Sequence, residues 1–331
     1  MLVAPFAWRP LLVWLGPDST SLQPSNLPVL EAARERYPFD ATPIADLQAT
    51  RPAYVVLGDS MSDRILPSRV TELTGKPAMS LMRLATGAAH WYLLYKNYLV
   101  ASGIPPARVV VFFRDTQITD PLYRLVGKDR FSIDTYAHDR EDELNAVVAA
   151  NVDNTWFRFH NTLDRVLLLE RTRDWLEPAL TRAVTAAAAG PDEPDAFTGS
   201  MNRMFALDRL RVMTADDMGE IDDASTDFDA RVERSTLPLI IGLAKARGDE
   251  LIFVRVLRRP DDQGRPPRES AALRRYAARV RAYVTAQGAR FFDDREDAAF
   301  GRLTYADGDH IADSDRAAYT DLFLKRLEAR P

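Results

Sequence analysis

Short apolar runs alternate with longer amphipathic stretches along much of the chain. Near-continuous apolar runs are typical of strands buried on both faces of a parallel sheet, and amphipathic stretches between them are typical of covering helices. We therefore predict an α/β fold, a three-layer α/β/α sandwich with a five-stranded parallel sheet. The strands are expected at Ala53–Leu57, Pro77–Met82, Arg108–Phe113, Glu250–Val256 and Ala289–Phe292, and helices at Ala88–Ala101, Arg231–Arg247, Ser270–Gln287 and Ser314–Ala329.

A long segment, residues 116–230, separates the third predicted strand from the fourth without a comparable apolar run. Within it, Asp153–Ala189 has the pattern of one long or broken helix, and a loop follows. Segments of this length inside a compact domain are usually lids or subdomains. We predict a mainly helical insertion over the carboxyl edge of the sheet, in a domain of residues 51–331 that follows an N-terminal arm of residues 1–50.

The first sixteen residues are mostly apolar, but Pro5, Arg9 and Pro10 interrupt them. They are too short to span a bilayer, which takes roughly 20 apolar residues, and they lack a clear signal-peptide pattern. Two interpretations stay open, an apolar arm packed on the domain and the remnant of a membrane anchor. No later stretch of the sequence is apolar enough to cross a membrane.

Composition narrows the chemistry more than the fold. Of 331 residues, 46% are hydrophobic and 27% charged, which is an ordinary globular balance. The net charge of −5 argues against a general nucleic-acid binder. The absence of cysteine excludes disulfides, thiolate nucleophiles and Cys-ligated metals. Imidazole chemistry has four candidates: His90, His138, His160 and His310.

The first candidate for chemistry follows the first predicted strand, where Gly58, Asp59 and Ser60 stand in a row. Ligands of open α/β sheets bind beyond the carboxyl ends of the strands. A glycine there allows a sharp turn that presents Ser60 at the start of a helix, whose backbone N–H groups favour a developing oxyanion. The same three residues also suit an ordinary helix N-cap.

The second candidate lies before the last predicted helix, where Asp307 and His310 are three residues apart. This spacing lets the carboxylate orient the imidazole and stabilise its charged form when a serine is deprotonated. An acidic turn that caps the helix is the simpler interpretation of this segment alone. A metal site of Asp307, Asp309, His310, Asp313 and Asp315 matches neither calcium-loop nor zinc spacing, so we expect no metal or cofactor.

Together, Gly-Asp-Ser after the first strand and Asp-x-x-His before the last helix resemble the SGNH (GDSL-type) hydrolase superfamily, over nearly the whole chain outside the insertion. The resemblance implies a five-stranded flavodoxin-like sandwich with Ser60 as nucleophile, His310 as general base and Asp307 orienting it. It also implies an oxyanion hole formed by the amides of Ser60 and Gly87. The usual Gly-x-Asn-Asp block is missing, because Arg114 stands where the oxyanion-binding asparagine is expected.

This departure leaves two readings of the third strand's end. Arg114 either donates to the oxyanion or a substrate anion in place of the asparagine, or forms a structural pair with Asp115. In the second case the two backbone amides remain as the oxyanion hole. Loss of one donor typically costs roughly 100- to 1000-fold in rate.

Three further segments carry a finer resemblance: Arg51–Ser60, the aromatic-rich stretch after Gly87 (His90, Trp91, Tyr92 and Tyr95), and Phe113–Asp115 at the end of the third strand. They resemble the branch of the superfamily associated with O-acetylation of alginate and other bacterial exopolysaccharides. That resemblance implies a serine O-acyltransferase or esterase acting on a glycan, with a membrane-bound O-acyltransferase as a possible partner, and it slightly favours an extracytoplasmic location. The alternative is a catalytically silent glycan-binding or assembly protein of the same fold. Candidate substrate-binding residues are Asp59, His90, Trp91, Asp115, Arg255 and Arg258. The alternative for His90 is a place in the core or at its rim, the alternative to sugar stacking for Trp91 is packing, and the alternative for the arginines is a solvated loop.

Overall fold

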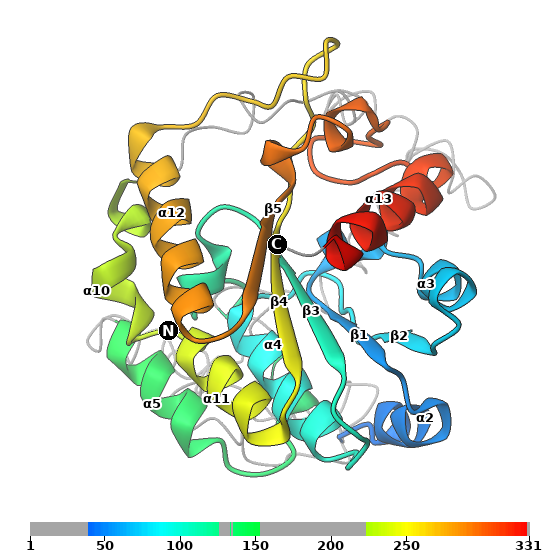
Figure 1. The fold of residues 1–331 in the computed structure, drawn as a ribbon. Coiled ribbons are helices and arrows are strands. Elements are labelled where there is room, and N and C mark those ends of the chain that lie inside the picture. Colours follow the sequence, from blue (N-terminus) through cyan, green and yellow to red (C-terminus); the bar gives the residue numbers. More distant parts are fainter. Residues whose placement is uncertain (1–38, 126–132, 134, 153–222, 330–331) are drawn as a thin grey trace, which may run out of the picture. The chain divides into compact units, whose positions relative to one another are not determined.

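The computed structural model describes residues 39–125, 133, 135–152 and 223–329, and the predicted five-stranded sheet lies within them (Figure 1). All neighbouring strands pair in parallel, in the order β2-β1-β3-β4-β5. The fold is therefore of the predicted α/β class, with the strand order of flavodoxin-like sheets. The strands are β1 (Tyr54–Leu57), β2 (Ala78–Ser80), β3 (Arg108–Phe113), β4 (Glu250–Arg255) and β5 (Arg290–Asp293).

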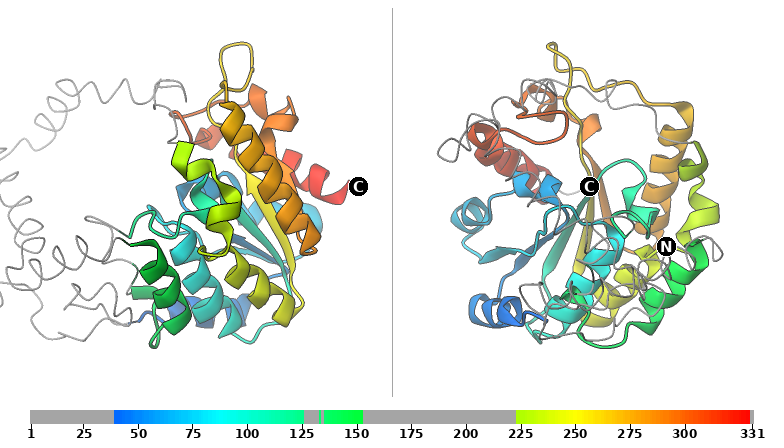
Figure 2. Two further views of the ribbon diagram at one scale, coloured as in Figure 1. Left: turned by 90° about the vertical axis from the view of Figure 1, so that its left-hand side faces the viewer. Right: turned by 180° about the vertical axis from the view of Figure 1, so that it is seen from behind.

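Helices cover both faces of this sheet, as the two further views confirm (Figure 2). Alternate residues such as Val110, Phe112 and Val254 form a buried core with Tyr319 and Phe323 on one face. Because side chains alternate along a strand, the intervening residues face the other helical layer. The first face packs against α3 (Pro67–Thr74) and α13 (Arg316–Glu328), and the second lies under α4 (Ala88–Leu94), α11 (Leu237–Arg247) and α12 (Ala271–Ala286).

Two predicted helices differ from the structure. The stretch predicted as one helix up to Arg247 is split into α10 (Phe228–Val232) and α11, and Pro238 lies in the first turn of α11, where proline is well tolerated. The helix predicted from Ala88 changes after Leu94 into a π-helical segment, η3 (Tyr95–Val100). The helix expected to start at Ser60 is the 3-10 helix η2 (Ser60–Arg64). The sequence did not predict α2 (Thr42–Thr50) or α3, nor the 3-10 helices η4 (Gln117–Thr119), η7 (Asp223–Thr226), η8 (Asp294–Glu296), η9 (Phe300–Arg302) and η10 (Asp313–Asp315).

The chain divides into two compact units, residues 1–39 with 130–210 and residues 40–129 with 211–331. The second unit holds the whole sheet. In the first, the structure describes α5 (Asp142–Asn151), whereas the helix predicted at Asp153–Ala189 and the apolar N-terminus lie outside the described residues. Within the described part, no helix has the length and apolar character to span a membrane. The domain boundaries proposed from the sequence stay a prediction.

Candidate active site

A sharp turn between β1 and η2 carries Ser60. Gly58 has φ of +151°, and a Cβ there would lie 2.9 Å from Ser62 Cβ and 3.2 Å from the Phe112 carbonyl oxygen. Only glycine fits this conformation and this crowding. Ser60 is consequently the first residue of η2, at the carboxyl edge of the sheet, although the helix that begins there is a five-residue 3-10 helix.

Asp59 holds this turn together. Its Oδ1 accepts a hydrogen bond from the Met61 amide at 2.9 Å, and its Oδ2 accepts one from Gln117 Nε2 at 2.9 Å. Asp59 is also buried. The N-cap interpretation of the sequence therefore describes Asp59, and its carboxylate is committed to the protein rather than turned to a ligand.

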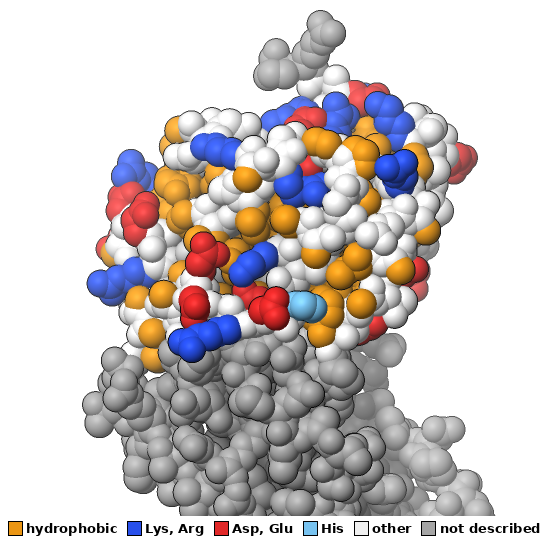
Figure 3. Space-filling view, turned by 90° about the horizontal axis from the view of Figure 1, so that it is seen from below, with side chains coloured by type: hydrophobic (Ala, Val, Ile, Leu, Met, Phe, Trp, Pro, Cys, Tyr) orange, Lys and Arg blue, Asp and Glu red, His pale blue; other side chains and the backbone are white. Residues whose placement is uncertain are grey.

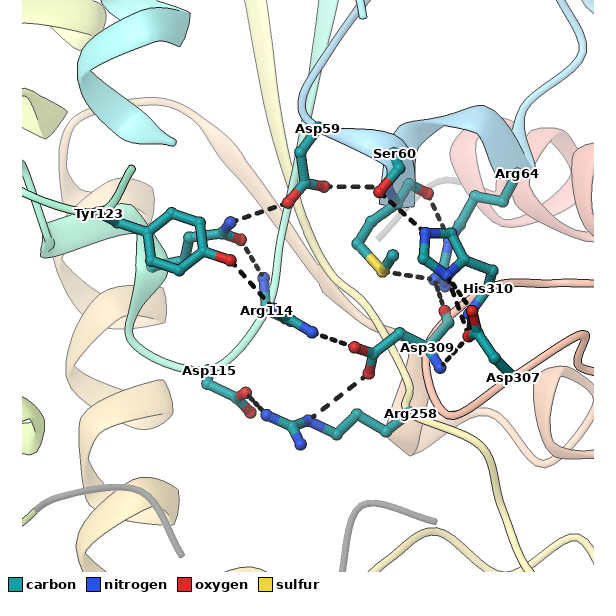
Figure 4. Close-up of polar contacts among 12 residues, drawn as sticks. Asp59, Ser60, Arg64, Arg114, Asp115, Tyr123, Arg258, Asp307, Asp309 and His310 are labelled. Atoms are coloured by element: carbon teal, nitrogen blue, oxygen red, sulfur yellow. Dashed lines mark hydrogen bonds and ion pairs between the residues drawn. The ribbon is translucent and has the colours of Figure 1, made fainter. Parts of the chain in front are cut away.

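Ser60, His310 and Asp307 lie in one line of hydrogen bonds (Figure 4). His310 Nε2 is 2.8 Å from Ser60 Oγ, and His310 Nδ1 is 2.8 Å and 3.0 Å from the two oxygens of Asp307. A proton on Nδ1 that donates to Asp307 leaves Nε2 as the acceptor of the Ser60 proton. This is the arrangement in which an imidazole acts as a general base toward a serine.

Asp307 is fixed by its own backbone surroundings. Its Oδ1 accepts hydrogen bonds from the amides of Asp309 at 2.8 Å and His310 at 2.7 Å. Partial burial acts to raise the pKa of this carboxyl, but the two amides and the His310 ring outweigh it and hold the pKa below its ordinary value of 3.8. Asp307 is therefore ionised at neutral pH and able to stabilise an imidazolium.

The side chain of Arg114 points toward Asp309 (Figure 4). Its guanidinium pairs with Asp309 through Nη1, and its Nη2 donates to the Tyr123 hydroxyl at 3.1 Å. Burial acts to lower the pKa of Arg114, but Asp309 and Tyr123 outweigh it and keep the pKa above its ordinary value. An oxyanion-binding role for Arg114 stays a prediction, and two nitrogens of its guanidinium are engaged by these partners.

The predicted pair of Arg114 with Asp115 is wrong. Asp115 pairs instead with Arg258, whose Nε lies 3.9 Å from the free oxygen of Asp309. Asp115 has φ of +44°, a backbone turn that separates its side chain from that of its neighbour Arg114. Arg258 and Asp115, both predicted to bind substrate, are therefore already engaged with protein charges.

Gly87 lies where the sequence placed it, immediately before α4, but its amide donates to His90 Nδ1 at 3.3 Å. An oxyanion role for this amide stays a prediction, and His90 would have to release it. His90 and Trp91 are fully buried, and the Trp91 indole donates to Thr86 Oγ1 at 3.1 Å. For Trp91, the packing interpretation describes this structure, in which the ring is buried in the protein.

The remaining candidates also have structural partners. Arg255 is buried and pairs with Asp293 at 2.8 Å and with Glu269. In the part of the chain that the structure describes, no three His, Asp or Glu side chains gather as metal ligands. In the loop that the metal interpretation concerned, the carboxylate of Asp309 faces two arginines, Arg114 and Arg258.

Sequence reasoning missed four residues that surround the candidate site: Arg64, Gln117, Tyr123 and Asp309 as an ion-pair partner. Only spacing could have suggested them. Arg64 is one helical turn beyond Ser60, and Asp309 lies between two candidate catalytic residues. Their partners are distant in sequence, so nothing local predicts the contacts.

The sequence matches no model of a protein family, and no curated protein matches it. The arrangement of Ser60, His310 and Asp307 is therefore the observation on which a function has to be built.

Proposed function

We propose that this protein is a serine-dependent O-acyltransferase or esterase that works through an acyl-enzyme on Ser60. The observation that carries the proposal is the 2.8 Å contact between Ser60 Oγ and His310 Nε2, with Asp307 on the opposite side of the ring. Nucleophile, base and orienting carboxylate in this order are the shared feature of acyl-transfer sites on unrelated folds.

In the first half of the reaction, His310 Nε2 takes the Ser60 proton while Ser60 Oγ bonds to the acyl carbon. The donor's carbon–oxygen bond then breaks, and its oxygen leaves with the proton from His310. In the second half, a sugar hydroxyl or water gives its proton to His310 and attacks the acyl carbon. The bond to Ser60 Oγ breaks, and Ser60 regains its proton. Asp307 remains ionised throughout and balances the imidazolium.

The Ser60 amide is the one predicted oxyanion donor without a protein acceptor among the described residues. Gly87 and Arg114 are engaged by His90 and by Asp309. An oxyanion stabilised by fewer preorganised donors reacts more slowly. We therefore expect modest turnover with simple esters.

The substrate class rests on the resemblance to proteins of glycan O-acetylation, with acetyl as the expected acyl group and a membrane-bound O-acyltransferase as the expected source of it. The side chains of His310 and Asp307 are 39% and 37% exposed. Such accessibility is compatible with a polymeric acceptor at the site. An extracytoplasmic location follows from the same resemblance.

Hydrolysis of p-nitrophenyl acetate by the full chain tests the proposal. Ser60→Ala and His310→Ala should each lower kcat/KM by about a thousandfold or more. Ser62→Ala is the matched control for the serine, because Ser62 belongs to the same helix but donates to the Asp59 carbonyl at 2.7 Å. His138→Ala is the control for the histidine, since His138 also lies 2.8 Å from an aspartate, Asp139. Unchanged turnover in both site variants would refute the proposal.

A second candidate, a catalytically silent glycan-binding protein, is favoured by the engagement of Arg114 and Gly87 with other protein groups. A serine-directed fluorophosphonate separates the two functions. Stoichiometric labelling of Ser60, lost in Ser60→Ala and kept in Ser62→Ala, excludes the silent protein. Saturable glycan binding without any labelling supports it.

A further inference from the structure

The contact between Ser60 and His310 joins segments that are 250 residues apart in the sequence. Its geometry depends on how the loop Tyr305–Ile311 is held. The loop is closed on itself by a bridge between Tyr305 and Ile311 and by the Ala306 amide, which donates to the His310 carbonyl at 2.8 Å. These local bonds shape the loop but do not fix it against η2.

The Gly308 carbonyl oxygen accepts a hydrogen bond from the Arg259 amide, after β4, at 2.9 Å, and Asp309, between the two candidate catalytic residues, connects the loop to further strand ends (Figure 4). Its carboxylate pairs with Arg114 and lies 3.9 Å from Arg258 Nε. Its carbonyl oxygen accepts a hydrogen bond from Arg64 Nη2 at 2.9 Å. These arginines follow β3, β4 and β1, which are neighbours in the sheet, so three strand ends converge on one loop residue.

Arg64 also belongs to η2, the helix that begins with Ser60. Arg64 Nε donates to the Met61 carbonyl at 2.7 Å, and the residue is 2% exposed. The same guanidinium therefore touches the helix that begins with Ser60 and the loop that carries His310. Buried beneath the loop, Arg64 also lies 3.5 Å from Asp294, so its charge is retained at this position.

Because the carboxylate of Asp309 is buried, its ion pairs hold the loop firmly in place. Asp309 is 6% exposed, and a charge that far from water needs its partners. If the loop moved outward, Arg114 and Arg258 would lose a buried counter-charge. The free-energy cost of that separation keeps His310 at one distance from Ser60.

We propose that Asp309 is a positioning residue, which holds His310 against Ser60 through its contacts with Arg114, Arg258 and Arg64. The proposal rests on the proposed function for its effect on turnover. It also assigns Arg114 a different use from the oxyanion role expected from its position after β3.

Asp309→Asn tests the role, because asparagine has nearly the same shape and lacks the charge. We expect kcat for p-nitrophenyl acetate to fall about 10- to 100-fold, since small misplacement of a catalytic group has effects of that size. KM should stay within about twofold, because Asp309 does not touch substrate. The matched control is Asp249→Asn, the same change at a buried carboxylate that binds Arg247 at 2.8 Å beyond the amino end of β4. It should cost stability but leave kcat unchanged.

A measurement without turnover separates this proposal from the proposed function. Proton NMR should show a low-field resonance of the His310 N–H bonded to Asp307 in the wild type and in Asp249→Asn, and a weakened or shifted one in Asp309→Asn. If the asparagine variant does not fold, Asp309→Glu keeps the charge at a different reach, and the same shift with a reduced kcat is expected. Wild-type kcat and an unchanged resonance in a folded Asp309 variant would overturn the proposal. An inactive wild type whose resonance responds to Asp309→Asn refutes only the proposed function.

Discussion

The two edges of the sheet carry similar charged networks and different chemistry. At the amino edge, Glu250 at the start of β4 binds Arg108 Nε at 2.5 Å and Arg290 Nη1 at 3.3 Å. A cavity of about 410 Å³ opens there beside Arg108, Arg290 and Lys76. Figure 3 views the molecule from this end, where basic and acidic side chains lie next to one another. At the carboxyl edge, Asp309 lies between Arg114 and Arg258 in a comparable way.

Comparing the two edges of the sheet shows which features identify a candidate site and which do not. Arginine–carboxylate pairs occur at both edges, so an arginine near Ser60 is not in itself a substrate-binding residue. A serine hydroxyl in contact with an imidazole that an aspartate orients occurs, among the described residues, at the carboxyl edge. Burial of the ion pairs differs too, because Arg255 is 3% exposed whereas Arg108 is 37% exposed.

The largest effect expected in a comparison of the two edges comes from Asp307→Asn, which should lower kcat/KM roughly 10²- to 10⁴-fold, because an amide cannot balance the imidazolium and favours the wrong tautomer. Ester hydrolysis per folded molecule is the measurement. Asp249→Asn, at the amino edge, is expected to leave it unchanged. Equal losses in the two variants would contradict the difference between the two edges, since both carboxylates would then affect turnover only by supporting the fold.

The same variant has a signature at acid pH. The pKa of Asp307 is lowered in the folded protein, so its contribution to stability is present above about pH 4 and is lost as the pH falls through the lowered value. In Asp307→Asn, the fall in the free energy of unfolding between about pH 5 and pH 3 should be shallower than in the wild type. An equal or steeper fall would mean that the amides do not hold the pKa of this carboxyl below its ordinary value.

The sequence predicted the sheet and the catalytic candidates because both leave local signals. Five apolar runs located five strands, and the predicted β3 bounds are those found. Gly58 indicated the turn before Ser60, and the spacing of Asp307 and His310 indicated that they would be in contact. The partners of Arg114 and Asp59 could not be predicted, because the pairs Arg114–Asp309 and Asp59–Gln117 join residues far apart in sequence. Many arginines and aspartates compete for such pairings, and only the packed fold selects among them.

The next prediction tests whether buried ion pairs contribute more to the free energy of unfolding than exposed ion pairs do. Arg255→Met leaves Asp293 and Glu269 without their guanidinium in a buried place, and should lower the free energy of unfolding by about 3–5 kcal/mol. Arg108→Met, at the amino edge, should cost about 1 kcal/mol or less, because water screens that pair. Urea unfolding at pH 7 measures both. A raised KM with unchanged stability in Arg255→Met would instead support the substrate-binding role predicted for Arg255 from the sequence.

One glycine at each edge gives an effect on stability, and the two effects differ in kind. Gly87 has φ of −139°, so its backbone suits any residue, but a Cβ there would lie 2.8 Å from Tyr123 Cδ1 and 2.8 Å from its carbonyl oxygen. Gly87→Ala should therefore cost about 1–3 kcal/mol by overpacking. Gly248 has φ of +77° and only Pro106 Cγ nearby, at 3.8 Å, so Gly248→Ala should cost about 1 kcal/mol through backbone strain.

Side-chain size distinguishes crowding from strain at these two positions. At Gly87 the loss of unfolding free energy, measured in urea, should grow from alanine to valine, because each added atom meets Tyr123. At Gly248 serine should cost the same as alanine, and asparagine less, since asparagine tolerates the left-handed conformation. Equal costs for alanine and valine at Gly87 would mean that Tyr123 moves aside readily. The close contact between Tyr123 and the turn before α4 would then not restrict which side chains fit at the carboxyl edge of the sheet.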